Sequence, residues 1–125
     1  MSRALARTLA RWFPTPAVWG LTFFSFGALA VAWALALWKL PGFAPTPDTL
    51  ISLHYNVYLG VDEVGRWQQG LLIPATASLT VLLAPLVAKH EQGVRPVFAA
   101  LIRVTAVLVA CATVAALFFI LVANV

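Results

Sequence analysis

Residues 53–67, with the sequence LHYNVYLGVDEVGRW, gather one of the two histidines, both tyrosines and two of the four acidic residues of this chain. His54, Asp62 and Glu63 stand close together within this segment. An imidazole and two carboxylates can act as general acids or bases, and they can also bind a metal such as zinc. Acid–base catalysis and metal binding are therefore the chemistries to compare with the spacing of these residues.

The spacing lacks the signatures of both chemistries. The segment has no H-x-x-x-H or H-E-x-x-H pattern, and the one cysteine of the chain, Cys111, lies in a distant apolar run. No serine or cysteine nucleophile stands at a recognisable spacing from His54. We therefore predict a protein without catalytic activity, metal or cofactor.

The same segment suits a structural role at a membrane surface. Gly60 and Gly65 allow turns with positive φ, and Asn56 and Asp62 can hydrogen-bond the backbone of such turns. Aromatic side chains are typical of the interface between lipid and water. Four aromatic residues lie in this segment or shortly before it: Trp38, Tyr55, Tyr58 and Trp67. We interpret the segment as an ordered, partly re-entrant cap over the ends of membrane helices.

The composition indicates an integral membrane protein. The 125 residues are 62% hydrophobic and 10% charged, with a mean hydropathy of +0.95. Soluble domains carry about 25% charged residues. The net charge of +4 comes from basic residues at the ends of apolar runs. They form no patch interleaved with aromatic residues, so we predict no nucleic-acid partner.

The expected fold is an all-α integral membrane domain of three transmembrane helices preceded by a short amphipathic interfacial helix. That first helix covers residues 1–13, where Arg3, Arg7 and Arg11 recur every fourth residue and can face anionic headgroups. Prolines at positions 14 and 16 end it.

Three apolar stretches predict the spans. About 20 apolar residues cross a bilayer as a helix, whereas the apolar core of a signal peptide is only about 7–15 residues long, so we expect the first stretch to be a retained anchor. The predicted boundaries are 17–40 for span 1, 41–66 for the outer loop, 67–88 for span 2, 89–95 for a cytoplasmic loop and 96–123 for span 3.

The orientation follows from the positive-inside rule. The N-terminal segment and residues 89–95 hold most of the lysines and arginines, whereas Lys39 and Arg66 stand on the other side. We predict a multi-pass protein of the bacterial cell (inner) membrane, with the N-terminus cytoplasmic and with the motif loop and the C-terminus outward.

Two features within the spans predict how the helices pack. Small residues form a ridge at Ala28, Ala32 and Ala36 on the first span, and a second ridge runs from Ala106 to Thr113 on the third. Such ridges let helices approach closely, and we favour packing within one bundle over a dimer face. Arg103 leaves two interpretations open, an intramembrane cation with a function or a side chain that snorkels to the cytoplasmic interface.

The order of polar residues in the segment resembles a motif, L-H-Y-N-x-Y-x-G-x-D-x-x-G-x-W, of small uncharacterised bacterial membrane proteins, in which it lies between the first and second spans. The matching positions are His54, Tyr55, Asn56, Tyr58, Gly60, Asp62, Gly65 and Trp67. A more distant resemblance is to the domain of unknown function of Sdp-type immunity membrane proteins, with a different spacing around the glycine and the aspartate. Both resemblances imply a recurrent membrane module and no particular reaction.

From these observations we expect a small non-catalytic membrane protein that acts as an interaction or accessory subunit of a membrane complex through its outward LHYN loop. Its expected partners are the lipid bilayer and either another membrane protein or a second copy of the chain. The alternative is a small transport or immunity protein that binds a ligand or a peptide at the outer loop.

Overall fold

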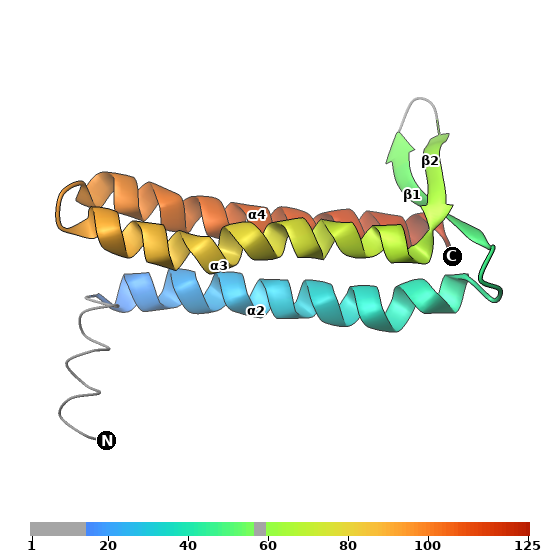
Figure 1. The fold of residues 1–125 in the computed structure, drawn as a ribbon, viewed down its shortest axis with the longest axis horizontal. Coiled ribbons are helices and arrows are strands. Elements are labelled where there is room, and N and C mark those ends of the chain that lie inside the picture. The colour runs from blue at the N-terminus through green and yellow to red at the C-terminus, as the bar shows by residue number, and fades with distance from the viewer. Residues whose placement is uncertain (1–14, 57–59) are drawn as a thin grey trace, which may run out of the picture.

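The computed structural model describes the backbone of residues 15–56 and 60–125, and the side chains in these ranges except those of residues 54–56 and 60–63. Within these ranges, three long helices lie side by side and a β-hairpin stands at one end of them (Figure 1). The predicted interfacial helix, with Arg3, Arg7 and Arg11, falls outside the described residues, and so does Tyr58.

The helical elements follow the predicted spans closely. In chain order they are α2 (Pro16–Lys39), η1 (Leu40–Phe43), η2 (Trp67–Leu71), α3 (Leu72–Gln92) and α4 (Pro96–Ala123), where η denotes a 3₁₀ helix. Residues 89–92, which the sequence predicts to be part of a loop, continue α3 instead, because none of these four residues is a glycine or a proline. Proline stands in the first turn of both α2 and α4, where its missing N–H is not needed.

The buried residues of each long helix recur at alternating intervals of three and four positions. On α2 they are Thr22, Ser25, Leu29, Ala32 and Ala36; on α3 they are Pro74, Ala77, Val81, Ala84 and Ala88; on α4 they are Ala99, Arg103, Ala106, Ala110, Thr113, Leu117 and Ile120. A repeat of 3.5 residues is typical of helices that pack along a left-handed seam. Alanine dominates these seams, so the backbones can approach closely. The predicted packing within one bundle is confirmed at Ala32, Ala36, Ala106, Ala110 and Thr113, which are all buried. Ala28, the remaining member of the ridge on α2, is only partly buried.

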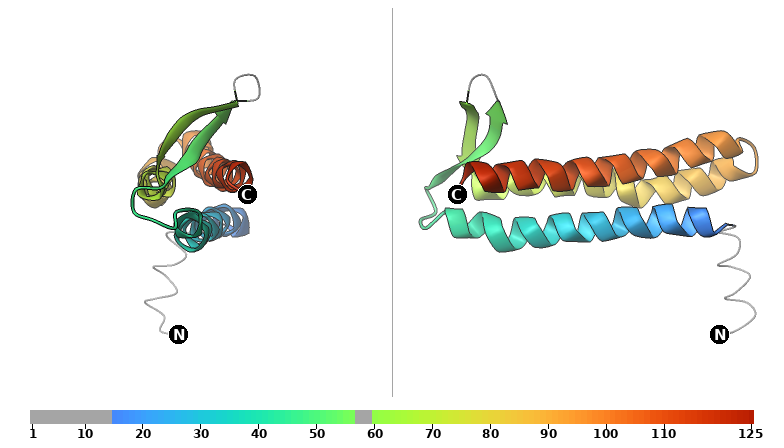
Figure 2. Two further views of the ribbon diagram at one scale, coloured as in Figure 1. Left: turned by 90° about the vertical axis from the view of Figure 1, so that its right-hand side faces the viewer. Right: turned by 180° about the vertical axis from the view of Figure 1, so that it is seen from behind.

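The chain between α2 and η2 forms a β-hairpin, which the all-helical prediction missed. Strand β1 (Leu50–Asn56) pairs antiparallel with β2 (Gly60–Arg66). The missed signal is the apolar–polar alternation of this stretch with its aromatic and β-branched residues, a pattern typical of strands. The hairpin leans away from the helix ends, and the C-terminus lies beside its base (Figure 2).

The register of the hairpin is irregular at two points. Ser52 faces Val64 and His54 faces Glu63, so Leu53 is an extra residue on β1. Tyr55 then faces Val61, so Asp62 is an extra residue on β2. Each extra residue is a bulge that increases the local twist. Because the bulges lie on opposite strands, their offsets cancel toward the tip of the hairpin.

A core that includes four large aliphatic side chains joins the hairpin to the bundle. Its buried members are Ala32, Ala36, Leu40, Ile51, Leu117 and Ile120. Ile51 comes from β1, so the hairpin and the helix ends share one core. We call this region the hairpin end of the bundle, and the region around Pro16 and Gly93 the opposite end.

Candidate functional site

The side chain of Asn124, just after α4, holds the backbone of β1. The Ser52 N–H donates to Asn124 Oδ1 at 2.8 Å, and Asn124 Nδ2 donates to the Ser52 carbonyl at 2.7 Å. The same Nδ2 also donates to the Ile120 carbonyl at 2.8 Å, which fixes the amide on its own helix. The side-chain amide therefore forms the same pair of hydrogen bonds with Ser52 of β1 that a residue of a neighbouring strand would form.

Two glycines let the base of the hairpin pack tightly. A Cβ atom at Gly65 would collide with Oε1 of Gln69 and with the Leu53 side chain. A Cβ atom at Gly70 would lie 2.8 Å from Leu40 Cδ1. The predicted role of Gly65 in a turn with positive φ is wrong, because this residue lies inside β2 without such a φ. Its lack of a side chain is what the packing requires.

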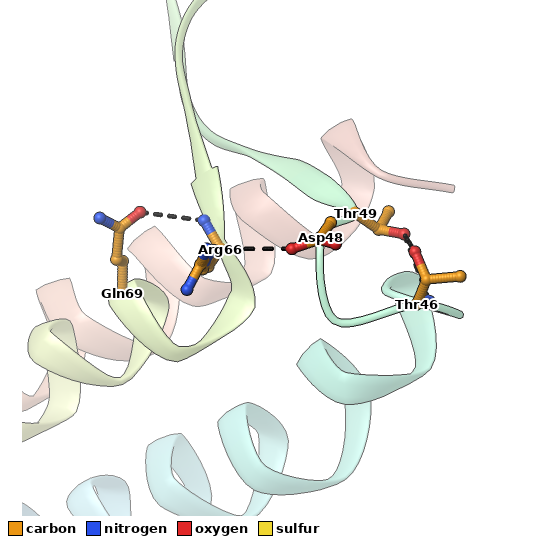
Figure 3. Close-up of polar contacts among 5 residues, drawn as sticks. All are labelled: Thr46, Asp48, Thr49, Arg66 and Gln69. Atoms are coloured by element: carbon orange, nitrogen blue, oxygen red, sulfur yellow. Dashed lines mark hydrogen bonds and ion pairs between the residues drawn. The ribbon is translucent and has the colours of Figure 1, made fainter.

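Polar contacts support the same base from the solvent side (Figure 3). The Arg66 N–H donates to Gln69 Oε1 at 2.9 Å, which satisfies a free amide at the start of η2. The Arg66 guanidinium lies 3.9 Å from the Asp48 carboxylate, and both side chains are exposed, so this ion pair contributes little. Thr46 and Thr49 share a hydrogen bond of 2.7 Å between their hydroxyls in the segment before β1.

The hairpin brings together the residues that the sequence motif singles out. His54, Tyr55 and Asn56 are in β1, Gly60, Asp62 and Gly65 are in β2, and Trp67 begins η2. The backbone register sets His54 opposite Glu63 and Asn56 opposite Gly60. In the parts of the chain whose side chains are described, no group of three metal-binding residues occurs.

The predicted aromatic belt divides into two environments. Trp38 is 73% exposed on α2, and Lys39 Nζ lies 4.1 Å from the centre of its ring, within reach of a cation–π interaction. Trp67 instead packs against the core of the hairpin end. Trp38 thus suits an interface with lipid headgroups, whereas Trp67 helps to seat the hairpin.

An apolar cavity of ≈ 270 Å³ opens beside the base of the hairpin. It lies between β1, the start of α3 and the last turns of α4, and its lining is Ser52, Leu53, Ile73, Ala116, Phe119, Ile120 and Ala123. The space remains open because two of the residues on α4 that line it, Ala116 and Ala123, have small side chains. The cavity has room for an apolar side chain of a bound molecule.

Arg103 lies far from the hairpin, on the buried seam of α4. It is only 5% exposed, and its Nη2 donates to Gln92 Oε1 at 3.0 Å. Of the two sequence interpretations, this burial favours an enclosed cation over a side chain that runs along lipid. Sequence reasoning missed Gln92 as its partner, because the contact joins the last turn of α3 to the second turn of α4.

Among the described residues, three helical stretches are long and apolar enough to cross a membrane: Pro16–Phe43, Trp67–Gln92 and Pro96–Ala123. By length and composition, the chain is a multi-pass membrane protein with a β-hairpin between its first two spans. Comparisons with protein-family models, with curated proteins and with solved structures find no match to it. The motif resemblance of residues 53–67 therefore stays a prediction.

Proposed function

We propose that this protein is a non-catalytic accessory subunit of a membrane complex and that it docks a membrane-protein partner through the hairpin. The observation that carries the proposal is a hairpin fixed firmly at its base, whose two strands, in the part of the chain that the structure describes, pair with no third strand. Each strand of such a sheet presents unpaired backbone groups along its outer side. A partner can bind there by adding a strand of its own.

The outer edge of β2 is the better candidate for strand addition. Ser52 turns both of its backbone groups to Asn124, away from β2. In an antiparallel pair, its cross-strand neighbour Val64 then turns its own N–H and carbonyl away from β1. The Val64 side chain is exposed as well. The edge of β1 is occupied by Asn124 at the same level, so a new strand meets less obstruction on β2.

The interior of the bundle favours docking over transport. A substrate or proton pathway through a membrane uses ionisable groups that face one another. Within the described spans, Arg103 is the one buried ionisable side chain, and its bonded partner is the neutral amide of Gln92.

Val64→Pro tests the docking directly, because proline removes the outward N–H of an edge strand and is tolerated there. Affinity purification in mild detergent is expected to recover a partner, or a second copy of the chain, with the wild type and with the control Val64→Thr. Recovery is expected to fail with Val64→Pro and with His54→Ala/Asp62→Ala. Equal recovery by all four proteins would refute docking through the hairpin.

A second control separates docking from general damage. Lys89→Ala/Glu91→Ala removes one cation and one anion at the opposite end of the bundle, and recovery is expected to be normal. All variants are first compared by thermal unfolding in the same detergent. A loss of partner in this control as well would show that the loss is not specific to the hairpin, and it would contradict docking through the hairpin.

We propose further that the hairpin faces outward from the cytoplasmic membrane of a bacterium. The support is the distribution of lysines and arginines: Lys89, Arg95 and Arg103 lie toward the opposite end of the bundle, and three more arginines precede Pro16 in the sequence, whereas only Lys39 and Arg66 lie toward the hairpin end. Asp48 is a suitable reporter, because its side chain is 93% exposed beside the hairpin. In a Cys111→Ser background, Asp48→Cys is expected to react with an impermeant maleimide from outside. Reaction only from the cytoplasmic side would reverse the orientation.

The cavity at the base of the hairpin supports a second candidate function, that of an immunity or transport protein that binds a peptide or ligand at this end. Ala116→Phe fills the cavity from α4 and leaves the outer edge of β2 intact. Loss of binding in Ala116→Phe, with normal binding in Val64→Pro, would favour this second function.

A further inference from the structure

A layer of polar groups crosses the seam of the bundle between its middle and the opposite end. Thr22 and Ser25 supply hydroxyls from α2, and Arg103 supplies a guanidinium from α4. Together with Ala84, Pro85 and Ala106 they line one small cavity. We call these residues the polar layer. Arg103, Thr22 and Ser25 are all buried, so the layer lies inside the protein and does not face lipid.

One donor of this layer is left without a protein partner. Arg103 Nη2 is bonded to Gln92, but Arg103 Nε is buried and has no acceptor among the described residues. Buried N–H groups in folded proteins nearly always have a partner, either a protein group or an ordered water. The orphaned Nε–H therefore indicates a further acceptor in the cavity.

The walls of the cavity can hold such an acceptor in place. Ser25 Oγ donates its hydrogen to the Thr22 carbonyl at 2.9 Å, so its lone pairs remain able to accept. Pro85 lies inside α3 and has no N–H, so the Val81 carbonyl one turn earlier loses its usual helical donor. The layer thus contains one donor that needs an acceptor, Arg103 Nε–H, and one acceptor that can use a donor, Ser25 Oγ. The Val81 carbonyl, on the buried seam of α3 one turn before Pro85, is a second acceptor next to the layer.

The size of the cavity limits what can occupy it. It offers ≈ 10 Å³ to the centre of a water-sized sphere. That is about the room that one buried water requires. A chloride ion is larger than a water molecule, and it would accept from Arg103 without donating to the Val81 carbonyl.

We propose that a single structural water occupies the polar layer, where it accepts a hydrogen bond from Arg103 Nε–H and donates to the Val81 carbonyl and to Ser25 Oγ. The water supplies the hydrogen-bond acceptor that the buried Arg103 guanidinium lacks among the protein groups. This site is independent of the hairpin and of the docking function proposed above.

The test is the contact between Arg103 Nε–H and water in the full-length protein. Protein labelled with ¹⁵N-arginine is placed in lipid nanodiscs, and the Nε–H resonance of Arg103 is assigned by its loss in Arg103→Lys. If that variant fails to fold, Gln92→Ala assigns the resonance by the shift of the bonded guanidinium. A cross-peak to water with the sign of a long-lived contact is expected.

Two variants localise the water. Ser25→Ala removes one acceptor and is expected to abolish or strongly weaken the cross-peak. Thr105→Val is the matched control, since Thr105 is exposed on α4 and bonds the Leu101 carbonyl outside the layer. A resolved Nε–H signal without a water cross-peak would overturn the proposal. So would a shift of that signal when chloride is exchanged for gluconate.

Discussion

The hairpin end and the polar layer bury backbone and polar groups in different ways. At the hairpin end, large side chains such as Leu40 and Leu117 fill the space. The Asn124 side-chain amide accepts a hydrogen bond from the Ser52 N–H and donates one to the Ser52 carbonyl. In the polar layer, the neighbouring seam residues are small, and one nitrogen of Arg103 lacks a protein partner. Stability is therefore expected to depend mainly on the hairpin end.

The largest effect is expected from Leu117→Ala, which opens a cavity in the core of the hairpin end. The free energy of unfolding should fall by roughly 2–4 kcal/mol, as for other buried leucines. Unfolding by SDS titration in mild detergent, followed by tryptophan fluorescence, measures the change. Leu108→Ala on the exposed face of α4 is the control and should change little. Equal losses of unfolding free energy in the two variants would contradict a special contribution of the core at the hairpin end.

Gly65→Ala sharpens the comparison by placing one methyl group where the hairpin base has no room for it. The collision with Gln69 and Leu53 is expected to cost about 1–3 kcal/mol. Gly27→Ala is the control, because a Cβ there meets nothing within 4 Å, and it should be neutral or stabilising by up to about 1 kcal/mol. The same SDS titration compares them, and an unchanged Gly65→Ala would argue against close packing at the base.

Asn124→Ala should loosen the hairpin more than it destabilises the bundle. It leaves the Ser52 N–H and carbonyl without these bonds, at a cost of about 1–2 kcal/mol. Hydrogen exchange at the Ser52 amide should become faster, while exchange in α3 stays unchanged. Val125→Ala alters the exposed neighbouring residue and should leave exchange as in the wild type. Unaltered exchange at Ser52 in Asn124→Ala would exclude the side-chain bridge.

Arg103→Met should have the smallest effect on stability. Replacing a buried polar group by an apolar one of similar length removes both the desolvation cost and the favourable bond, so a change below about 1 kcal/mol is expected. The measurement is again SDS titration. A loss as large as that of Leu117→Ala would mean that the polar layer contributes as much stability as the hairpin end.

The sequence predicted the membrane helices well because their signal is local. Apolar runs of sufficient length, with prolines at their starts, place α2 and α4 to within about one residue. The small-residue ridge from Ala106 to Thr113 likewise predicts burial, since helical spacing sets a common face.

The hairpin and the polar layer depend on contacts between distant segments, which explains why sequence reasoning missed them. The bond between Ser52 and Asn124 spans 72 positions, and Arg103 meets Gln92 only because the turn at Gly93 brings α3 and α4 together. Most of the motif residues lie together in the hairpin, with His54, Tyr55 and Asn56 in β1 and Gly60, Asp62 and Gly65 in β2. Their arrangement as paired strands and the tight packing around Gly65 can be seen only in the three-dimensional structure.

The link between Ser52 and Asn124 also orders events during biosynthesis. The hairpin segment leaves the ribosome before α3 and α4, whereas Asn124 follows them. The Ser52 backbone can therefore reach this partner only after both later helices have crossed the bilayer. The hairpin acquires its final anchorage last, so a partner that recognises the anchored hairpin recognises chains whose three helices are already inserted.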